Sequence, residues 1–125
     1  MTESELQKRA LASGPLDEEV ISDLRAEGEN LFQDLIKLFL TEAPANVQEI
    51  SNAVSENDFE TIALSAHRLK GSAFTFGAFK LGELCQRLEM AGKAGEFAKV
   101  ESLFNQLMPE CSRVSSALKA EQKDC

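Results

Sequence analysis

The stretch that organises this chain is residues 66–74, which read Ala66-His67-Arg68-Leu69-Lys70-Gly71-Ser72-Ala73-Phe74. Apolar residues at positions 66, 69, 73 and 76 recur at helical spacing and predict an amphipathic helix. His67, the only histidine of the sequence, lies beside this apolar stripe, with Lys70 and Gly71 one turn later on the same side. A glycine inside a helix costs about 1 kcal/mol relative to alanine, so we interpret Gly71 as leaving space next to the imidazole. The stretch therefore predicts a solvent-accessible histidine with a lysine beside it.

These residues resemble the phosphoacceptor motif of the histidine-containing phosphotransfer (HPt) domain family, written H-x-x-K-G-[SA]-[SA] with a G-A pair soon after. His67, Lys70 and Gly71 stand at the offsets of the motif, and Gly77-Ala78 supplies the later pair. The resemblance extends over about residues 15–112. It implies a phosphotransfer protein of a multistep two-component phosphorelay. His67 would accept a phosphoryl group from a receiver-domain aspartyl phosphate and pass it to another response-regulator aspartate.

The resemblance also implies roles for the neighbouring residues and a set of partners. Lys70 would stabilise the phosphoryl charge, and Gly71 would give access to the imidazole. Some family members hydrogen-bond the histidine through a polar residue, often glutamine, at the place where this chain has Glu89. Either Glu89 or Gln86 would orient the ring, or both are plain surface residues. The implied partners are receiver domains and a hybrid sensor histidine kinase, with no cofactor in this chain and Mg²⁺ supplied by the receiver.

Without the motif, the histidine has a simpler interpretation, as a partly buried side chain satisfied by a backbone carbonyl. Two other function classes also compete. An enzyme using a His–Glu pair as general base is disfavoured because no nucleophile, cofactor or metal motif accompanies it. No glycine-rich nucleotide loop is visible, so we expect a phosphocarrier without ATP-dependent kinase activity of its own. The remaining alternative is a non-catalytic helical adaptor or scaffold that binds a signalling partner.

Charge and composition restrict the partners further. The net charge of −8 argues against nucleic acid or an anionic membrane. Residues 67–93 are the exception, with five basic and two acidic residues and a net charge of +3. This charge would suit an acidic partner face or a phosphoryl group, or it consists of ordinary solvated helix charges. No apolar run approaches 18 residues and no signal peptide is visible, so we expect a cytoplasmic protein. We also expect a monomer. Cys85, Cys111 and Cys125 match no metal-ligand spacing and are expected to be reduced thiols.

Apolar periodicity predicts an all-α fold, an antiparallel up-down-up-down four-helix bundle with a short N-terminal capping helix. Glycines at 28, 77 and 92 are expected to end helices. Pro44 is expected to kink its helix without breaking it, and Pro109 to mark a bend or a join. The last apolar stripe begins at Phe97. The expected helices span about residues 17–28, 29–55, 58–76, 79–91 and 96–120.

Three segments are expected around this bundle: a loosely ordered polar lead-in over residues 1–14, the HPt bundle over 15–120 and a tail over 121–125. Met1 and the polar tail favour a free-standing protein over a piece of a hybrid kinase. The sequence names neither the kinase, the regulator, the signal nor the direction of phosphoryl flow.

The second helix carries more apolar residues than its core stripe needs, which suggests an exposed docking patch near His67. Phe74 is either an edge of the core or part of this patch, and both interpretations stay open. A basic rim would raise the association rate. The residues expected to contact the partner are Leu35, Leu38, Leu64, Arg68, Phe74 and Arg87.

Overall fold

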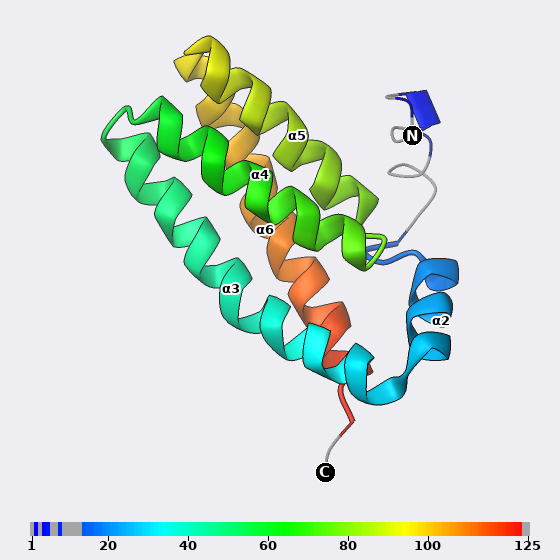
Figure 1. Cartoon of the computed structure of the whole chain (residues 1–125). Helices are drawn as coiled ribbons and strands as arrows, with labels where there is room; N and C mark the ends of the chain where they lie inside the picture. Colours follow the sequence, from blue (N-terminus) through cyan, green and yellow to red (C-terminus); the bar gives the residue numbers. More distant parts are fainter. Residues whose placement is uncertain (1, 3, 6–7, 9–13, 124–125) are drawn as a thin grey trace.

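The computed structural model describes residues 2, 4–5, 8 and 14–123, and between residues 14 and 123 the chain is helical with no strand (Figure 1). The all-α prediction is confirmed. Most of the predicted lead-in over residues 1–14 and the last two residues of the predicted tail lie outside the described residues. The helices are α2 (Glu18–Glu27), α3 (Glu29–Ser55), α4 (Phe59–Thr75), α5 (Phe79–Ala94) and α6 (Phe97–Glu121).

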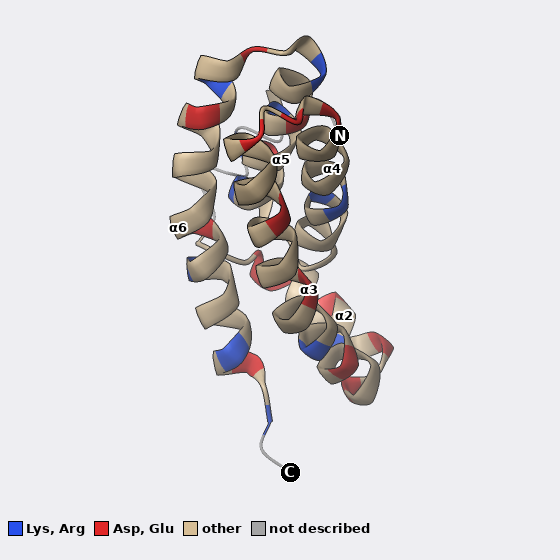
Figure 2. Ribbon diagram, turned by 90° about the vertical axis from the view of Figure 1, so that its left-hand side faces the viewer, with Lys and Arg blue, Asp and Glu red and all other residues tan. Residues whose placement is uncertain are grey.

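The four long helices share one core. Helix α4 packs between α3 and α5, and α6 packs against both α5 and α3, so each contacts two others (Figure 1). Helix α2 packs on α3, at the end of the molecule where α6 finishes (Figures 1 and 2). The largest fully buried side chains come from all four long helices and the α4–α5 turn: Phe32, Phe76, Ile36, Ile50, Ile62, Leu69, Leu81, Leu88, Leu107, Leu118, Val100 and Val114.

Local chemistry sets where the helices begin. The Asp17 side chain accepts a hydrogen bond from the Val20 N–H at 3.1 Å and caps α2. Asp58 caps α4 in the same way, accepting from the Thr61 N–H at 3.1 Å. These contacts satisfy N–H groups that a helix start leaves without partners.

Helix α5 ends later than predicted, and the expected stop at Gly92 is wrong. Gly92 lies inside the helix and is buried, while Gly95 ends it in the left-handed conformation with φ of 65°. A Cβ atom at position 92 would lie 3.2 Å from the Phe59 carbonyl oxygen and 3.3 Å from the Ala63 nitrogen. Gly92 therefore allows α5 to pack closely against α4 and does not end a helix.

Helices α3 and α6 run through Pro44 and Pro109 without a break, which agrees with the unbroken helix expected at Pro44. One further expectation changes in the structure. Phe97, predicted as the first core residue of the last helix, is 44% exposed, because it is the first residue of α6, where helical packing is incomplete. The buried stripe of α6 begins at Val100.

The turn between α4 and α5 offers a test of how α2 is held. Gly77 has φ of 66°, and a Cβ there would lie 2.6 Å from Asp17 Cβ and 3.0 Å from Val20 Cβ. Gly77→Ala should lower the free energy of unfolding by about 2–4 kcal/mol, since left-handed strain and a steric clash add.

The matched control is Gly95→Ala, because Gly95 has φ of 65° and no atom lies within 4 Å of the position that its Cβ would take. It should lose only about 1–2 kcal/mol, from the left-handed conformation alone. Urea denaturation measures both losses. Equal losses would show that α2 does not press on this turn.

Candidate functional site

His67 projects from α4 into solvent. Its side chain is 63% exposed, while its helix neighbours Ala66 and Leu69 are fully buried in the core. One turn on, Gly71 is exposed, and within the described part of the chain no atom beyond its sequence neighbours and its own helix backbone lies within 4 Å of the position that a Cβ would take. The accessible imidazole and the open space over Gly71 that the sequence predicted are both present. One edge of the ring is therefore free to meet a second molecule.

Glu89 of α5 holds the other edge of the ring. His67 Nδ1 lies 3.2 Å from Glu89 Oε1 and 3.1 Å from Oε2. The same carboxylate accepts from Lys70 Nζ at 3.0 Å and pairs with Lys93 Nζ at 3.1 Å. The Glu89 side chain is only 10% exposed. Within the described chain no hydrogen bond joins Gln86 to His67, so the structure brings Glu89, of the two candidates, to the ring.

The ionisation of Glu89 fixes the roles of the ring nitrogens. Burial alone would raise the pKa of Glu89, but the hydrogen bonds from Lys70, Lys93 and His67 outweigh it and hold the pKa at about 2. An ionised carboxylate only accepts hydrogen bonds, so Nδ1 of His67 must donate. In the neutral imidazole the lone pair then lies on Nε2, the nitrogen that does not face Glu89.

Two lysines contact Glu89, and neither has the arrangement expected from the sequence. Lys70 is paired with Glu89, with a side chain only 23% exposed, and is not a free cation beside the ring. Lys93 is a site residue that the sequence analysis missed, although its spacing of four residues after Glu89 is the signal for an ion pair on a helix. The site therefore contains two lysines that share one carboxylate.

The other predicted contact residues separate into exposed and packed ones. Leu38 and Leu64 are 52% and 53% exposed, whereas Leu35 is half-buried against the core. Phe74 is half-buried, with its ring 6.2 Å from that of Phe79. It also lies directly over Gly82, because a Cβ there would be 2.3 Å from the Phe74 ring. This packing favours the core-edge interpretation of Phe74.

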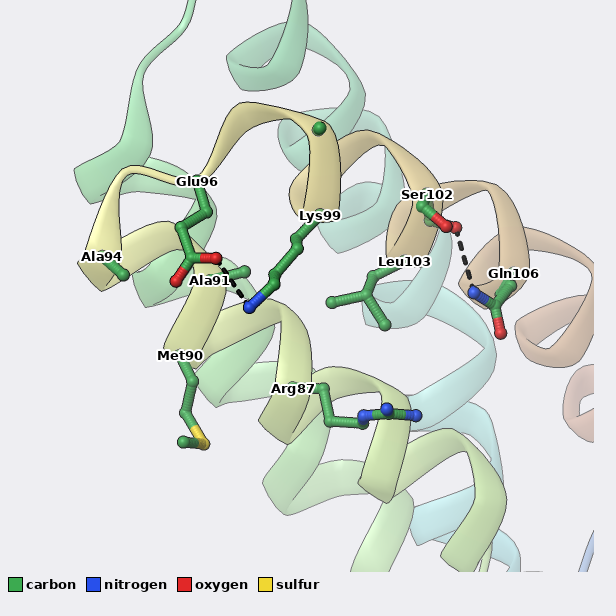
Figure 3. Close-up of a pocket in the computed structure, with 10 residues that line it drawn as sticks. Arg87, Met90, Ala91, Ala94, Glu96, Lys99, Ser102, Leu103 and Gln106 are labelled. Atoms are coloured by element: carbon green, nitrogen blue, oxygen red, sulfur yellow. Dashed lines mark hydrogen bonds and ion pairs between the residues drawn. The ribbon is translucent and has the colours of Figure 1, made fainter.

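The predicted basic residues face different neighbours. Arg68 Nη1 lies 3.4 Å from Glu49 Oε1 of α3. Arg87 lines a groove of about 620 Å³ between α5 and α6, together with Met90 and Leu103 (Figure 3). The structure thus does not bring Arg87 together with the His67 cluster. Among the residues that the structure describes, no group of three or more His, Cys, Asp or Glu could hold a metal ion.

Burial also determines the ionisation of the two described cysteines. Cys85 and Cys111 are free and buried, and burial, with a smaller effect of Glu110, raises the pKa of the Cys111 thiol to about 11. Cys125 lies outside the described residues. No helix in the described part of the chain is long and apolar enough to cross a membrane.

The hydrogen-bonded, ionised carboxylate of Glu89 predicts that the protein loses folding stability in acid. Its folded pKa of about 2 lies below its usual value of 4.5, so its contribution is complete above about pH 5 and is lost as pH falls toward 2. The loss should be on the order of 3 kcal/mol. Urea denaturation at several pH values should show wild type losing stability relative to Glu89→Gln over this range. Parallel curves for the two proteins would contradict the assignment.

Comparisons with known proteins agree with this geometry. The model of the Hpt domain family matches residues 34–120. The phosphorelay intermediate protein YPD1 of Candida albicans is 30% identical over 95 residues, which cover 74% of this chain and 51% of YPD1. The chain therefore spans about half the length of this relative.

Two solved structures have the same fold. Histidine-containing phosphotransfer protein B of Pseudomonas aeruginosa PAO1 superposes with a TM-score of 0.83 at 24% identity, covering 88% of this chain and 96% of its own. The HPT domain of a sensor hybrid histidine kinase from Shewanella has a TM-score of 0.72 at 26% identity, with coverage of 86% and 92%. The family model spans well over half of the sequence, and the chain belongs to the Hpt domain family.

Proposed function

We propose that this chain is a phosphotransfer protein of a multistep two-component phosphorelay, with His67 as the phosphoacceptor. The observation that carries the proposal is the exposed imidazole whose Nδ1 is held by the ionised carboxylate of Glu89. That contact leaves Nε2 as the nucleophilic nitrogen without requiring any further base. Family membership supports the same role, because the relative YPD1 is named a phosphorelay intermediate.

The transfer follows from this arrangement. Nε2 of His67 attacks the phosphorus of a receiver-domain aspartyl phosphate, and an Nε2–P bond forms. The bond from phosphorus to the aspartate oxygen breaks, and the carboxylate leaves with the electron pair. Nδ1 keeps its proton, which it donates to Glu89 in a hydrogen bond, so the ring becomes positively charged. The reverse sequence on a second receiver returns the imidazole to its neutral state.

Lys70 and Gly71 complete the proposed site. Lys70 Nζ stands on the side of the ring next to Glu89 and would partly neutralise the phosphoryl oxygens. Gly71 leaves the approach to Nε2 unobstructed. The chain itself would need no cofactor, since the receiver domain would supply Mg²⁺. It would have no ATP-dependent kinase activity and would act as a carrier.

We also propose a helix topology, a monomeric state and a set of partners for this domain. The domain over residues 15–120 would be an antiparallel up-down-up-down bundle with α2 as its cap, acting as a monomer. Receiver domains and a hybrid sensor histidine kinase would dock around His67. Leu64 and Leu38 are the exposed apolar candidates for that contact, and Arg68 follows Leu64 by one turn of α4. The cytoplasmic location expected from the sequence stays a prediction.

The phosphoacceptor assignment is tested by His67→Gln. A receiver domain charged with acetyl phosphate is mixed with the protein, and mass spectrometry detects the added phosphoryl group. Wild type should gain one group, labile in acid and stable in alkali, and the variant should gain none. Because His67 is exposed, helicity and thermal midpoint should remain close to wild type. Phosphorylation of the variant would refute the assignment, and an unphosphorylated wild type across a panel of receivers would favour an adaptor.

Gly71 tests the open approach to the ring. Gly71→Ala should be tolerated or gain up to about 1 kcal/mol in stability, because no neighbour would meet its Cβ and alanine favours helices. Its transfer rate should nevertheless fall. Gly71→Gln should block transfer, since a long side chain would cover Nε2. The measurement is the rate of phosphoryl loss from the charged receiver, and a wild-type rate in Gly71→Gln would show that partners do not approach over this residue.

A further inference from the structure

The Glu89 carboxylate has more partners than orientation of the ring requires. One oxygen accepts from Lys70 Nζ at 3.0 Å and the other pairs with Lys93 Nζ at 3.1 Å, while both lie within 3.2 Å of His67 Nδ1. A neutral amide at position 89 could accept from Nδ1 equally well. A carboxylate adds a negative charge that holds both lysines next to the phosphoacceptor.

Phosphorylation would place a second anion beside the same two cations. A phosphoryl group on Nε2 carries nearly two negative charges and three acceptor oxygens. Lys70 stands one helical turn from His67, and Lys93 carries a flexible side chain that is 68% exposed, so both can turn toward such a group. Each lysine charge must then be shared between the Glu89 carboxylate and the phosphoryl oxygens.

We infer that Glu89 weakens the binding of the phosphoryl group on His67, because its carboxylate keeps part of the charge of Lys70 and Lys93. Glu89 thereby favours onward transfer of the group. This inference rests on the proposed function of His67. Glu89 acts here as a positioning residue, because it works through the lysines and the imidazole. Lys93 becomes a second phosphoryl-binding residue, beside Lys70.

The proton on Nδ1 also favours loss of the phosphoryl group from His67. In phosphorylated His67 the Nδ1 proton would be donated to Glu89, and the positive charge of the ring makes the imidazole a better leaving group from phosphorus. A glutamine in its place could rotate its amide and donate to an unprotonated Nδ1. The ring of phosphohistidine would then be neutral and the phosphoryl group more persistent. The released lysine charge predicts that Glu89→Gln stabilises the phosphorylated protein, and the loss of the ring charge predicts that its phosphoryl group is lost more slowly.

The first experiment does not depend on any partner. Wild type, Glu89→Gln and the control Glu83→Gln are phosphorylated with potassium phosphoramidate, a chemical phosphoryl donor for imidazoles, and loss of the group is followed by ³¹P NMR. Glu83 makes a matched control, since it lies on α5, pairs with Arg87 at 3.9 Å and loses the same charge. Phosphohistidine should persist on the order of tenfold longer in Glu89→Gln than in wild type or control. An equal or shorter lifetime, or no phosphorylation of Glu89→Gln, would overturn the inference.

The second experiment measures the equilibrium share of phosphoryl groups between a receiver domain and each variant. Glu89→Gln should raise the share on His67 roughly tenfold, and Lys93→Gln should lower it. Lys93→Gln should have a larger effect in the Glu89→Gln background, where the lysine charge belongs to the phosphoryl group alone. A slower rate with unchanged equilibrium would reduce Glu89 to orienting the ring and overturn the inference.

The two proposals fail in different ways. If no receiver transfers a phosphoryl group to wild type, the proposed function is wrong, and the phosphoramidate lifetimes still test the role of Glu89. If receivers do transfer but the lifetimes and equilibria of Glu89→Gln match those of the Glu83→Gln control, the function stands and the inference is wrong.

Discussion

The buried carboxylate of Glu89 is the constraint on which the arrangement of α4 and α5 depends. A charged group that is 10% exposed is costly unless it is paired and hydrogen-bonded. Three donors offset that cost, two from α4 and one from its own helix. Removing Lys70, the one mostly buried donor, should destabilise more than the pair contributes, because the buried carboxylate would lose its least exposed partner. The site residues therefore stabilise the helix pair as well as prepare the histidine.

Backbone geometry brings these side chains within reach. His67 and Glu89 are 22 residues apart and meet because the chain reverses at Gly77, which has φ of 66°. The two helices then run close together, since a Cβ atom at position 92 would lie only 3.2 Å from the Phe59 carbonyl oxygen. A larger residue at position 92 would push α5 away from α4. Glycine at that position thus contributes to the short distance between Glu89 and the imidazole, although it touches neither.

The sequence predicts most of the helices because an apolar stripe repeating every three or four residues depends on the chain alone. It predicts α3 over residues 29–55 as observed. A glycine that ends a helix and a glycine that admits a neighbour look the same in sequence, so the prediction of a stop at Gly92 is wrong. Choosing between Gln86 and Glu89 needs the rotation of α5 relative to α4, which periodicity does not supply. The ion pair of Lys93 with Glu89, in contrast, is readable from their spacing.

The net charge of residues 67–93 in the sequence differs from the net charge of the group of side chains that they form in the fold. Residues 67–93 have a net charge of +3, yet every one of their five basic side chains has an acidic partner within 4 Å. Two of those partners, Glu49 and Glu110, come from outside the segment and leave a net charge of +1 for the group. A field this weak is largely screened beyond about 10 Å at ordinary salt concentrations. Lys70 and Lys93 can favour a phosphoryl group only at contact distance, where they also meet Glu89. Under the proposed function, selectivity for a partner would then come mainly from the shape and apolar surface around His67, where Leu64 is exposed, and less from long-range attraction.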